Sequence, residues 1–166
     1  MIRYALFLIC LLPIAAHAAV DYKDADFSIN LGSDWEHVPC DNKDQVAFMS
    51  KSQDISIKVM SLSVHMEPEQ LASKSKLIVG YALKNELNDN PNGSVTFFNS
   101  SLSEILGGYK AMFSGHDSRG RAFKWIGFIH KNQTIFLYLE TPLRYESKLE
   151  AAANIALQTF RYASVW

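Results

Sequence analysis

The chain has 166 residues with 16 basic and 17 acidic side chains, and 48% of its residues are hydrophobic. No run of lysine or arginine exceeds two residues. The sequence therefore lacks the basic cluster that would bind nucleic acid or an anionic membrane surface. Length and composition together predict one globular domain.

Residues 1–18, MIRYALFLICLLPIAAHA, have the three parts of a secretory signal peptide. Arg3 supplies the positive start, residues 4–16 form the apolar run, and Ala16-His17-Ala18 is a small-x-small cleavage site. This run of about 13 residues is short of the ~20 that span a bilayer. We expect cleavage after Ala18, with Ala16 as the alternative. The mature protein is then exported to a periplasm or secreted, without stable insertion in a membrane.

Two cysteines bear on processing and redox state. Cys10 does not indicate a lipoprotein, because the large Ile9 precedes it and the apolar run continues after it. Cleavage would leave Cys40 alone, so no internal disulfide is expected. Cys40 is either buried or paired with a second chain.

The first half of the mature chain, residues 19–166, predicts strands followed by a helix. Residues 21–26 are expected to be a loose polar lead-in, and a half-buried strand over 27–31 ends in a turn before Trp35. Further strands are expected at 45–51 and 55–64. A helix opens at Glu67-Pro68-Glu69 and ends at the Asn- and Gly-rich stretch 88–93. Its apolar stripe consists of Leu71, Ile78, Val79, Ala82 and Leu83.

The second half predicts two hairpins and a final helix. Strands are expected at 94–99 and 108–115, with a bend or bulge at Gly107-Gly108. A type I turn over 117–120 leads into the strands 121–130 and 133–140. Thr141-Pro142 is read as the cap and first residue of a helix that reaches Phe160. Its apolar face consists of Tyr145, Leu149, Ala152, Ala153, Ala156 and Phe160.

The hairpin 121–140 is apolar on both faces. With a two-residue loop at Lys131-Asn132, Gly127 faces Phe136, whose ring can then lie across the glycine. One face carries Ile126, Phe128, Ile135, Leu137 and Leu139, and the other carries Phe123, Trp125, Ile129, Phe136 and Tyr138. A sheet with one wet face alternates apolar with polar residues, so both faces of this hairpin are expected to be covered.

Three covers are possible for such a hairpin: lipid, a ligand or the two predicted helices. An aromatic C-terminal pattern, Phe160-x-Tyr162-x-Ser164-x-Trp166, is faintly similar to that of outer-membrane barrels, but two amphipathic helices have no place in a barrel wall. We therefore expect an α+β fold in which an antiparallel sheet of about six strands is sandwiched between helices. A ligand cavity under a lid is the alternative.

The order of elements resembles the PsbP-like superfamily, which includes the photosystem II extrinsic P subunit and DcrB. The likeness is carried by Phe27, Ile29, Leu31 and Trp35 near the start and by Asn132, Ile135, Leu137, Leu139, Pro142 and Phe160 near the end. Many members have Leu-Pro where this chain has Leu31-Gly32. The resemblance implies an α/β/α sandwich and a habit of binding other proteins, and it implies no catalytic residue.

No motif in the sequence predicts catalysis, a cofactor or a metal site. His37, His65, His116 and His130 lack metal-site spacing, and the hairpin register separates the last two by most of a strand. His116-Asp117-Ser118 has the residue types of a hydrolytic triad, but neighbouring side chains on a turn do not form the relay. Three glycosylation acceptor patterns begin at Asn92, Asn99 and Asn132, and they carry no meaning if the host is bacterial.

We therefore expect a non-catalytic, exported accessory protein of PsbP-like type that binds another protein. The first alternative is a carrier of a small hydrophobic ligand, with Trp125, Phe128, Phe136 and Tyr138 lining its cavity. The second is a small hydrolase whose residues converge only in three dimensions.

Overall fold

The computed structural model describes residues 19–42, 44–88 and 93–162. The predicted signal peptide, Asn92, Ser164 and Trp166 lie outside the described residues. Within them, no helix is long and apolar enough to cross a membrane.

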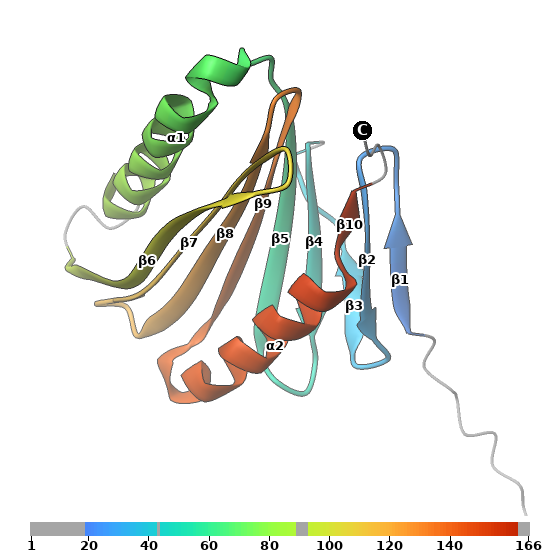
Figure 1. Ribbon diagram of the computed structural model, residues 1–166. Helices are drawn as coiled ribbons and strands as arrows, with labels where there is room; N and C mark the ends of the chain where they lie inside the picture. The colour runs from blue at the N-terminus through green and yellow to red at the C-terminus, as the bar shows by residue number, and fades with distance from the viewer. Residues whose placement is uncertain (1–18, 43, 89–92, 163–166) are drawn as a thin grey trace, which may run out of the picture.

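The centre of the fold is a seven-stranded antiparallel sheet in the order β3-β4-β5-β9-β8-β7-β6 (Figure 1). Its strands are β3 (Trp35–Val38), β4 (Gln45–Ser50), β5 (Ile55–Ser63), β6 (Val95–Ile105), β7 (Gly108–Asp117), β8 (Arg121–His130) and β9 (Gln133–Pro142). A smaller sheet has the order β1-β2-β10, with β1 (Val20–Lys23), β2 (Phe27–Gly32) and β10 (Arg161–Tyr162). The prediction of about six strands in one sheet is therefore corrected to seven strands plus a three-stranded sheet.

The lead-in to the first predicted strand is itself a strand, β1, and not a loose segment. Tyr22 is half-buried, and its ring packs 5.4 Å from that of Phe27 and 5.5 Å from that of Phe48. The Asp24 carboxylate accepts the backbone N–H groups of Asp26 and Phe27, which turns the chain into β2. The packing of Tyr22 and the turn held by Asp24 thus order this segment as a strand despite its polar composition.

Helix α1 (Pro68–Asn88) packs on one face of the large sheet, hereafter the α1 face. Its contacts are with β6, β7 and β8. All five residues of the predicted apolar stripe pack against the core on this face, which confirms the helix and its orientation. The buried members of that core are Met66, Ala111, Phe113, Phe123, Trp125 and Ile129.

Helix α2 (Glu146–Thr159) covers the opposite face, where it contacts β8, β9 and β2. Leu149, Ala152, Ala153 and Ala156 are buried there, as the predicted stripe requires. The helix begins later than expected, because β9 runs to Pro142 and a 3-10 turn (Leu143–Tyr145) follows it. Thr141 is not a helix cap, since its hydroxyl donates to the backbone oxygen of Asp54 at 3.0 Å.

The register of the central hairpin is the one predicted, with Trp125 opposite Tyr138 and Gly127 opposite Phe136. The Asp117–Gly120 turn is also confirmed, by a 3.1 Å hydrogen bond from the Gly120 N–H to the Asp117 oxygen. Strand β6 is longer than expected because it continues through a bulge near Asn99, which has a φ of 54°. At Gly107, where a bend or bulge was expected, the chain reverses from β6 into β7, and Gly107 has a φ of 73°.

Candidate functional site

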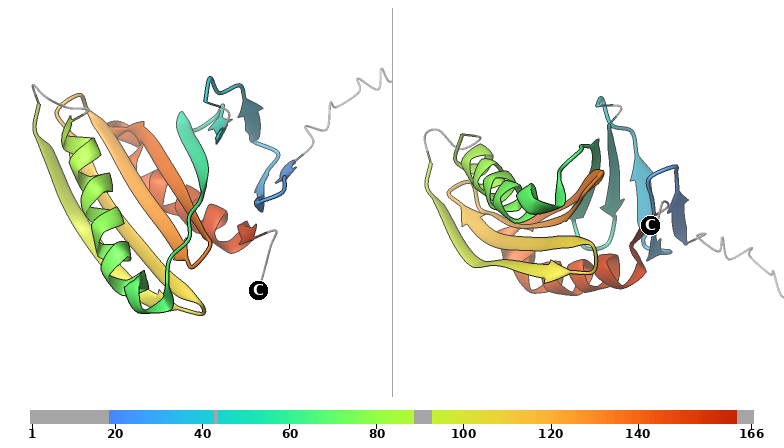
Figure 2. Two further views of the ribbon diagram at one scale, coloured as in Figure 1. Left: turned by 90° about the horizontal axis from the view of Figure 1, so that it is seen from above. Right: turned by 45° about the horizontal axis from the view of Figure 1, so that its top comes forward.

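Helix α1 covers only part of its face of the sheet. It lies over β6, β7 and β8 in the concave side of the curved sheet, and β4 and β5 continue beyond it (Figure 2). Between α1 and these strands runs a trough with a volume of about 560 Å³. The trough is lined by Gln45, Lys58, Met60, Leu62, Ile78, Tyr81, Ala82, Asn85, Glu86, Arg121, Trp125, Phe136 and Tyr138.

Aromatic rings from β8 and β9 contribute to the floor of the trough. Trp125 is 7% exposed, and its indole stacks on Phe113 with ring centroids 5.1 Å apart. On its other neighbour, Phe136, the centroid distance is also 5.1 Å. Phe136 and Tyr138 are half-buried and not fully covered. Phe128, on the opposite face of β8, is half-buried as well. The expectation that the two helices cover both faces of the hairpin therefore holds only in part.

One end of the trough is closed by a cluster of charges around Arg121. Its guanidinium donates to Asp117 Oδ2 at 2.9 Å, to Glu140 Oε2 at 2.7 Å and to Glu86 Oε2 at 3.1 Å. It also donates to the Tyr138 hydroxyl at 2.6 Å. The carboxylates come from β7, β9 and α1, so one side chain ties three elements together.

Burial and pairing pull the pKa values in this cluster in opposite directions. Burial alone would raise the pKa of Asp117, but hydrogen bonds from the Arg121 N–H and from the Arg119 and Arg121 side chains lower it overall. Burial also opposes ionisation of Glu140, and Arg121 and Lys58 again outweigh it and lower the pKa. The pKa of Tyr138 is raised, first by burial and then by the charge of Glu86. Both carboxylates are therefore ionised and the phenol is neutral at neutral pH.

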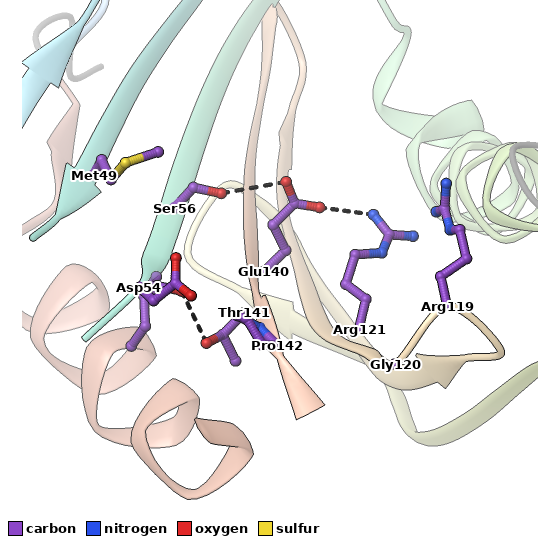
Figure 3. Close-up of a pocket in the computed structure, with 10 residues that line it drawn as sticks. Met49, Asp54, Ser56, Arg119, Gly120, Arg121, Glu140, Thr141 and Pro142 are labelled. Carbon is purple, nitrogen blue, oxygen red and sulfur yellow. Dashed lines mark hydrogen bonds and ion pairs between the residues drawn. The ribbon is translucent and has the colours of Figure 1, made fainter. Parts of the chain in front are cut away.

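A second hollow of about 430 Å³ adjoins the charged cluster (Figure 3). Within it Glu140 accepts from Ser56 at 3.3 Å and from Arg121 at 2.7 Å, as the dashed lines show. The side chains of Ser56, Glu140 and Arg121 are thus engaged with one another. The lining residues are Met49, Asp54, Ile55, Ser56, Arg119, Gly120, Arg121, Glu140, Thr141 and Pro142.

The rim of the trough displays large apolar side chains. Tyr81 on α1 is 65% exposed, and Leu62 on β5, across the trough, is 38% exposed. Leu77 is 60% exposed and lies one helical turn before Tyr81, on the same side of α1. We call Leu62, Leu77 and Tyr81 the apolar rim.

The predicted lining of a ligand cavity is only partly brought together. Trp125, Phe136 and Tyr138 line the trough. Phe128 does not, because it lies on the other face of β8, where its ring stacks on Phe160 at 5.3 Å. Sequence reasoning missed Lys58, Glu86 and Arg121. Glu86 did leave a signal, since it falls four residues after Ala82 in the apolar stripe of α1, where a charge needs a partner.

The side chains of His116 and Asp117 engage different partners. The Asp117 carboxylate binds Arg119 and Arg121, while His116 Nε2 lies 2.6 Å from Glu146 Oε1 on α2. His116 on β7 pairs with Ala122 at one end of the β7–β8 pair, and His130 on β8 pairs with Gly108 at the other end. The two histidines are therefore far apart. Over the described ranges, no three His, Cys, Asp or Glu side chains are grouped as metal ligands.

Cys40 is half-buried and not fully buried, and its pairing with a second chain stays a prediction. Its Sγ lies 3.7 Å from Gln45 Oε1. Gln45 also lines the trough, so the Cys40 thiol lies next to a residue of the trough.

One solved structure shares this architecture over nearly its whole length. The solution structure of cyanobacterial PsbP (CyanoP) from Synechocystis matches with a TM-score of 0.68 and 12% sequence identity, over 93% of this chain and 98% of that one. The chain has a PsbP-like fold. A crystal structure from Bacteroides thetaiotaomicron matches over 83% of this chain and 45% of its own, with a TM-score of 0.45 and 14% identity. No protein-family model and no curated protein sequence matches the chain.

Proposed function

We propose that the protein is an exported, non-catalytic accessory domain that binds another protein at the apolar rim of the trough. The observation that carries this proposal is the exposure of Leu77 and Tyr81, at 60% and 65%, beside an uncovered part of the sheet. Clustered exposed apolar side chains mark interaction surfaces. Leu77 does not line the trough, so a small molecule bound in the trough would leave Leu77 exposed. An apolar protein surface would cover both Leu77 and Tyr81.

The charged cluster supports binding over catalysis. Asp117 and Glu140 are held ionised by Arg121, so neither suits the role of a general acid at neutral pH. His116 is engaged by Glu146 on the other side of the sheet. Export to a periplasm or to the medium rests on the signal peptide expected at residues 1–18.

A carrier of a small hydrophobic ligand is the second candidate. It is favoured by one observation, the trough of about 560 Å³ whose lining includes Trp125, Phe136 and Tyr138. Ligand pockets commonly have volumes of about 300–1,000 Å³ and combine apolar walls with a few polar groups.

Capture of partners from the native host tests the protein-binding proposal. The mature chain is compared with a Leu77→Ser/Tyr81→Ser variant and with an Ile155→Ser control, since Ile155 is 43% exposed on α2. We expect a partner that is retained by the parent and the control and is lost with the double variant. Equal capture by all three proteins, or no partner at all, contradicts docking at the rim.

A further inference from the structure

The trough changes from apolar to polar along its length, and both walls change at the same level. On the strand side, Met60 lies opposite Phe136, the next inward pair is Lys58 and Tyr138, and Ser56 faces Glu140. On the helix side, Ile78 and Ala82 are followed one turn later by Asn85 and Glu86. Glu86 meets Tyr138 at 3.3 Å, which aligns the polar ends of the two walls.

The apolar segment is poorly suited to a bare extended peptide. Five of its side chains, Met60, Leu62, Ile78, Ala82 and Phe136, offer no strong hydrogen-bond donor or acceptor. The polar exception is Gln45 on β4, which pairs with Met60 and lies 3.7 Å from Cys40 Sγ. A peptide backbone laid against the five apolar side chains would lose its water without gaining partners on that side. A hydrocarbon chain has no such groups, and it gains free energy with each methylene that leaves water.

The polar end holds a cation placed to meet a negative head group. Arg121 is engaged by three carboxylates, as described above. Lys58 has a longer ion pair, with Nζ 3.6 Å from Glu140 Oε1, and its side chain remains 46% exposed. Its ammonium group can therefore take a second acceptor without breaking the cluster around Arg121.

From this gradient we infer that the trough binds a single-chain carboxylate amphiphile, such as a fatty acid. The chain lies along the apolar segment between α1 and β5, and the carboxylate meets Lys58 at the polar end. The inference rests on the second candidate function, the carrier of a small hydrophobic ligand, and names the class of that ligand. A ligand in the floor of the trough leaves Leu77 available to a protein.

Binding is measured by the fluorescence of cis-parinaric acid and its displacement by laurate and by dodecanol, with the mature protein. We expect saturable binding of one probe per chain, displaced by laurate. Affinity should rise up to about fourfold per buried methylene across a series of shorter fatty acids. No saturable binding, or a stoichiometry well above one, overturns the inference.

Two variants locate the chain and the head group. Leu62→Glu places a charge in the apolar segment and should weaken laurate at least about tenfold. Leu143→Glu, at 39% exposure outside the trough, should not. Lys58→Gln should weaken laurate about threefold to fivefold and leave dodecanol unchanged. Lys110→Gln is its control, since Lys110 lies on the opposite face of the sheet.

Equal effects of each variant and its control overturn the assignment. The Leu77→Ser variant separates this inference from the proposed function. Leu77→Ser alone should leave laurate binding intact, because Leu77 does not line the trough. A protein partner that is captured by a chain without saturable laurate binding contradicts the ligand inference and leaves protein docking standing.

Discussion

The indole ring of Trp125 lies directly over the backbone of Gly127, two residues further along the same face of β8. A Cβ added at Gly127 would lie 2.8 Å from Trp125 Cζ3 and still nearer to Cη2. Phe136 is the cross-strand partner of this glycine, as predicted, but the ring that lies across the glycine is that of Trp125 and not that of Phe136. The Phe136 ring packs against the indole at a tilt of 34°, with 5.1 Å between the ring centroids.

Gly127→Ala should therefore lower the free energy of unfolding by about 1–3 kcal/mol, because the indole must move to admit a methyl group. Urea denaturation measures the change. Gly80→Ala is the matched control, since a Cβ there meets nothing within 4 Å on an exposed helix. It should stabilise the protein by up to about 1 kcal/mol. Equal stability of the two variants contradicts the placement of Trp125.

Arg121→Met should lower the free energy of unfolding by about 3 kcal/mol or more, because it leaves buried carboxylates without their main partner. The Asp117 side chain is fully buried and that of Glu86 is 10% exposed. The control is Arg144→Met, which loses a 3.7 Å contact to Asp54 from a side chain that is 70% exposed. That change should stay within about 0.5 kcal/mol.

The same cluster predicts loss of stability in acid. The folded pKa values of Asp117 and Glu140 lie below their ordinary values of 3.8 and 4.5. The contribution of these two carboxylates to the free energy of unfolding is thus fully present above their ordinary pKa values. It is lost as the pH falls through their folded pKa values. Urea midpoints between about pH 6 and pH 3 should fall steeply for the parent and less steeply for Glu140→Gln. Parallel slopes contradict this assignment.

Tyr138 predicts a second limit, in alkali. The folded pKa of Tyr138 is raised above the ordinary 10.0. The contribution of the neutral phenol to the free energy of unfolding is therefore present below pH 10 and is lost as the pH rises further. Tyr162 is raised in the same direction by burial. In a titration followed by tyrosinate absorbance, these two phenols should ionise only as the protein unfolds. Reversible ionisation of all tyrosines near pH 10, with the fold intact, contradicts their burial.

Cys40 should react with a thiol reagent in the native state, but more slowly than in denaturant, because the residue is half-buried beside Gln45. The measurement is the labelling rate by mass spectrometry. Labelling that occurs only after unfolding contradicts the described exposure. A mixed disulfide in protein purified without reductant would show pairing with another chain.

Local pattern predicted the elements whose neighbours in space are also neighbours in sequence. The register of the β8–β9 hairpin follows from a two-residue turn and from side chains that alternate between two buried faces. The inward face of α1 follows from its helical period. By contrast, β1 contains VDYK, whose polar residues conceal the anchor Tyr22. Its pairing with β2 depends on contacts that pattern alone does not reveal.

The trough was beyond sequence reasoning for a different physical reason. Which strands a helix covers depends on where the chain crosses the sheet, and residue spacing carries no record of it. The charged cluster joins Glu86, Asp117 and Glu140 to Arg121, so its members are spread over more than fifty residues of sequence. Three of the four expected aromatic residues did reach the trough, because the hairpin register placed them on one face.

Site-specific photocrosslinking in the native host tests most directly whether the trough and its rim form the binding surface. A photoreactive phenylalanine derivative replaces Tyr81 at the rim in one variant and Ile155 on α2 in the other, both of which are exposed. We predict a discrete protein adduct from position 81 that is absent from position 155. An adduct from position 155 alone, or from neither position while a partner co-purifies, would contradict binding at the trough.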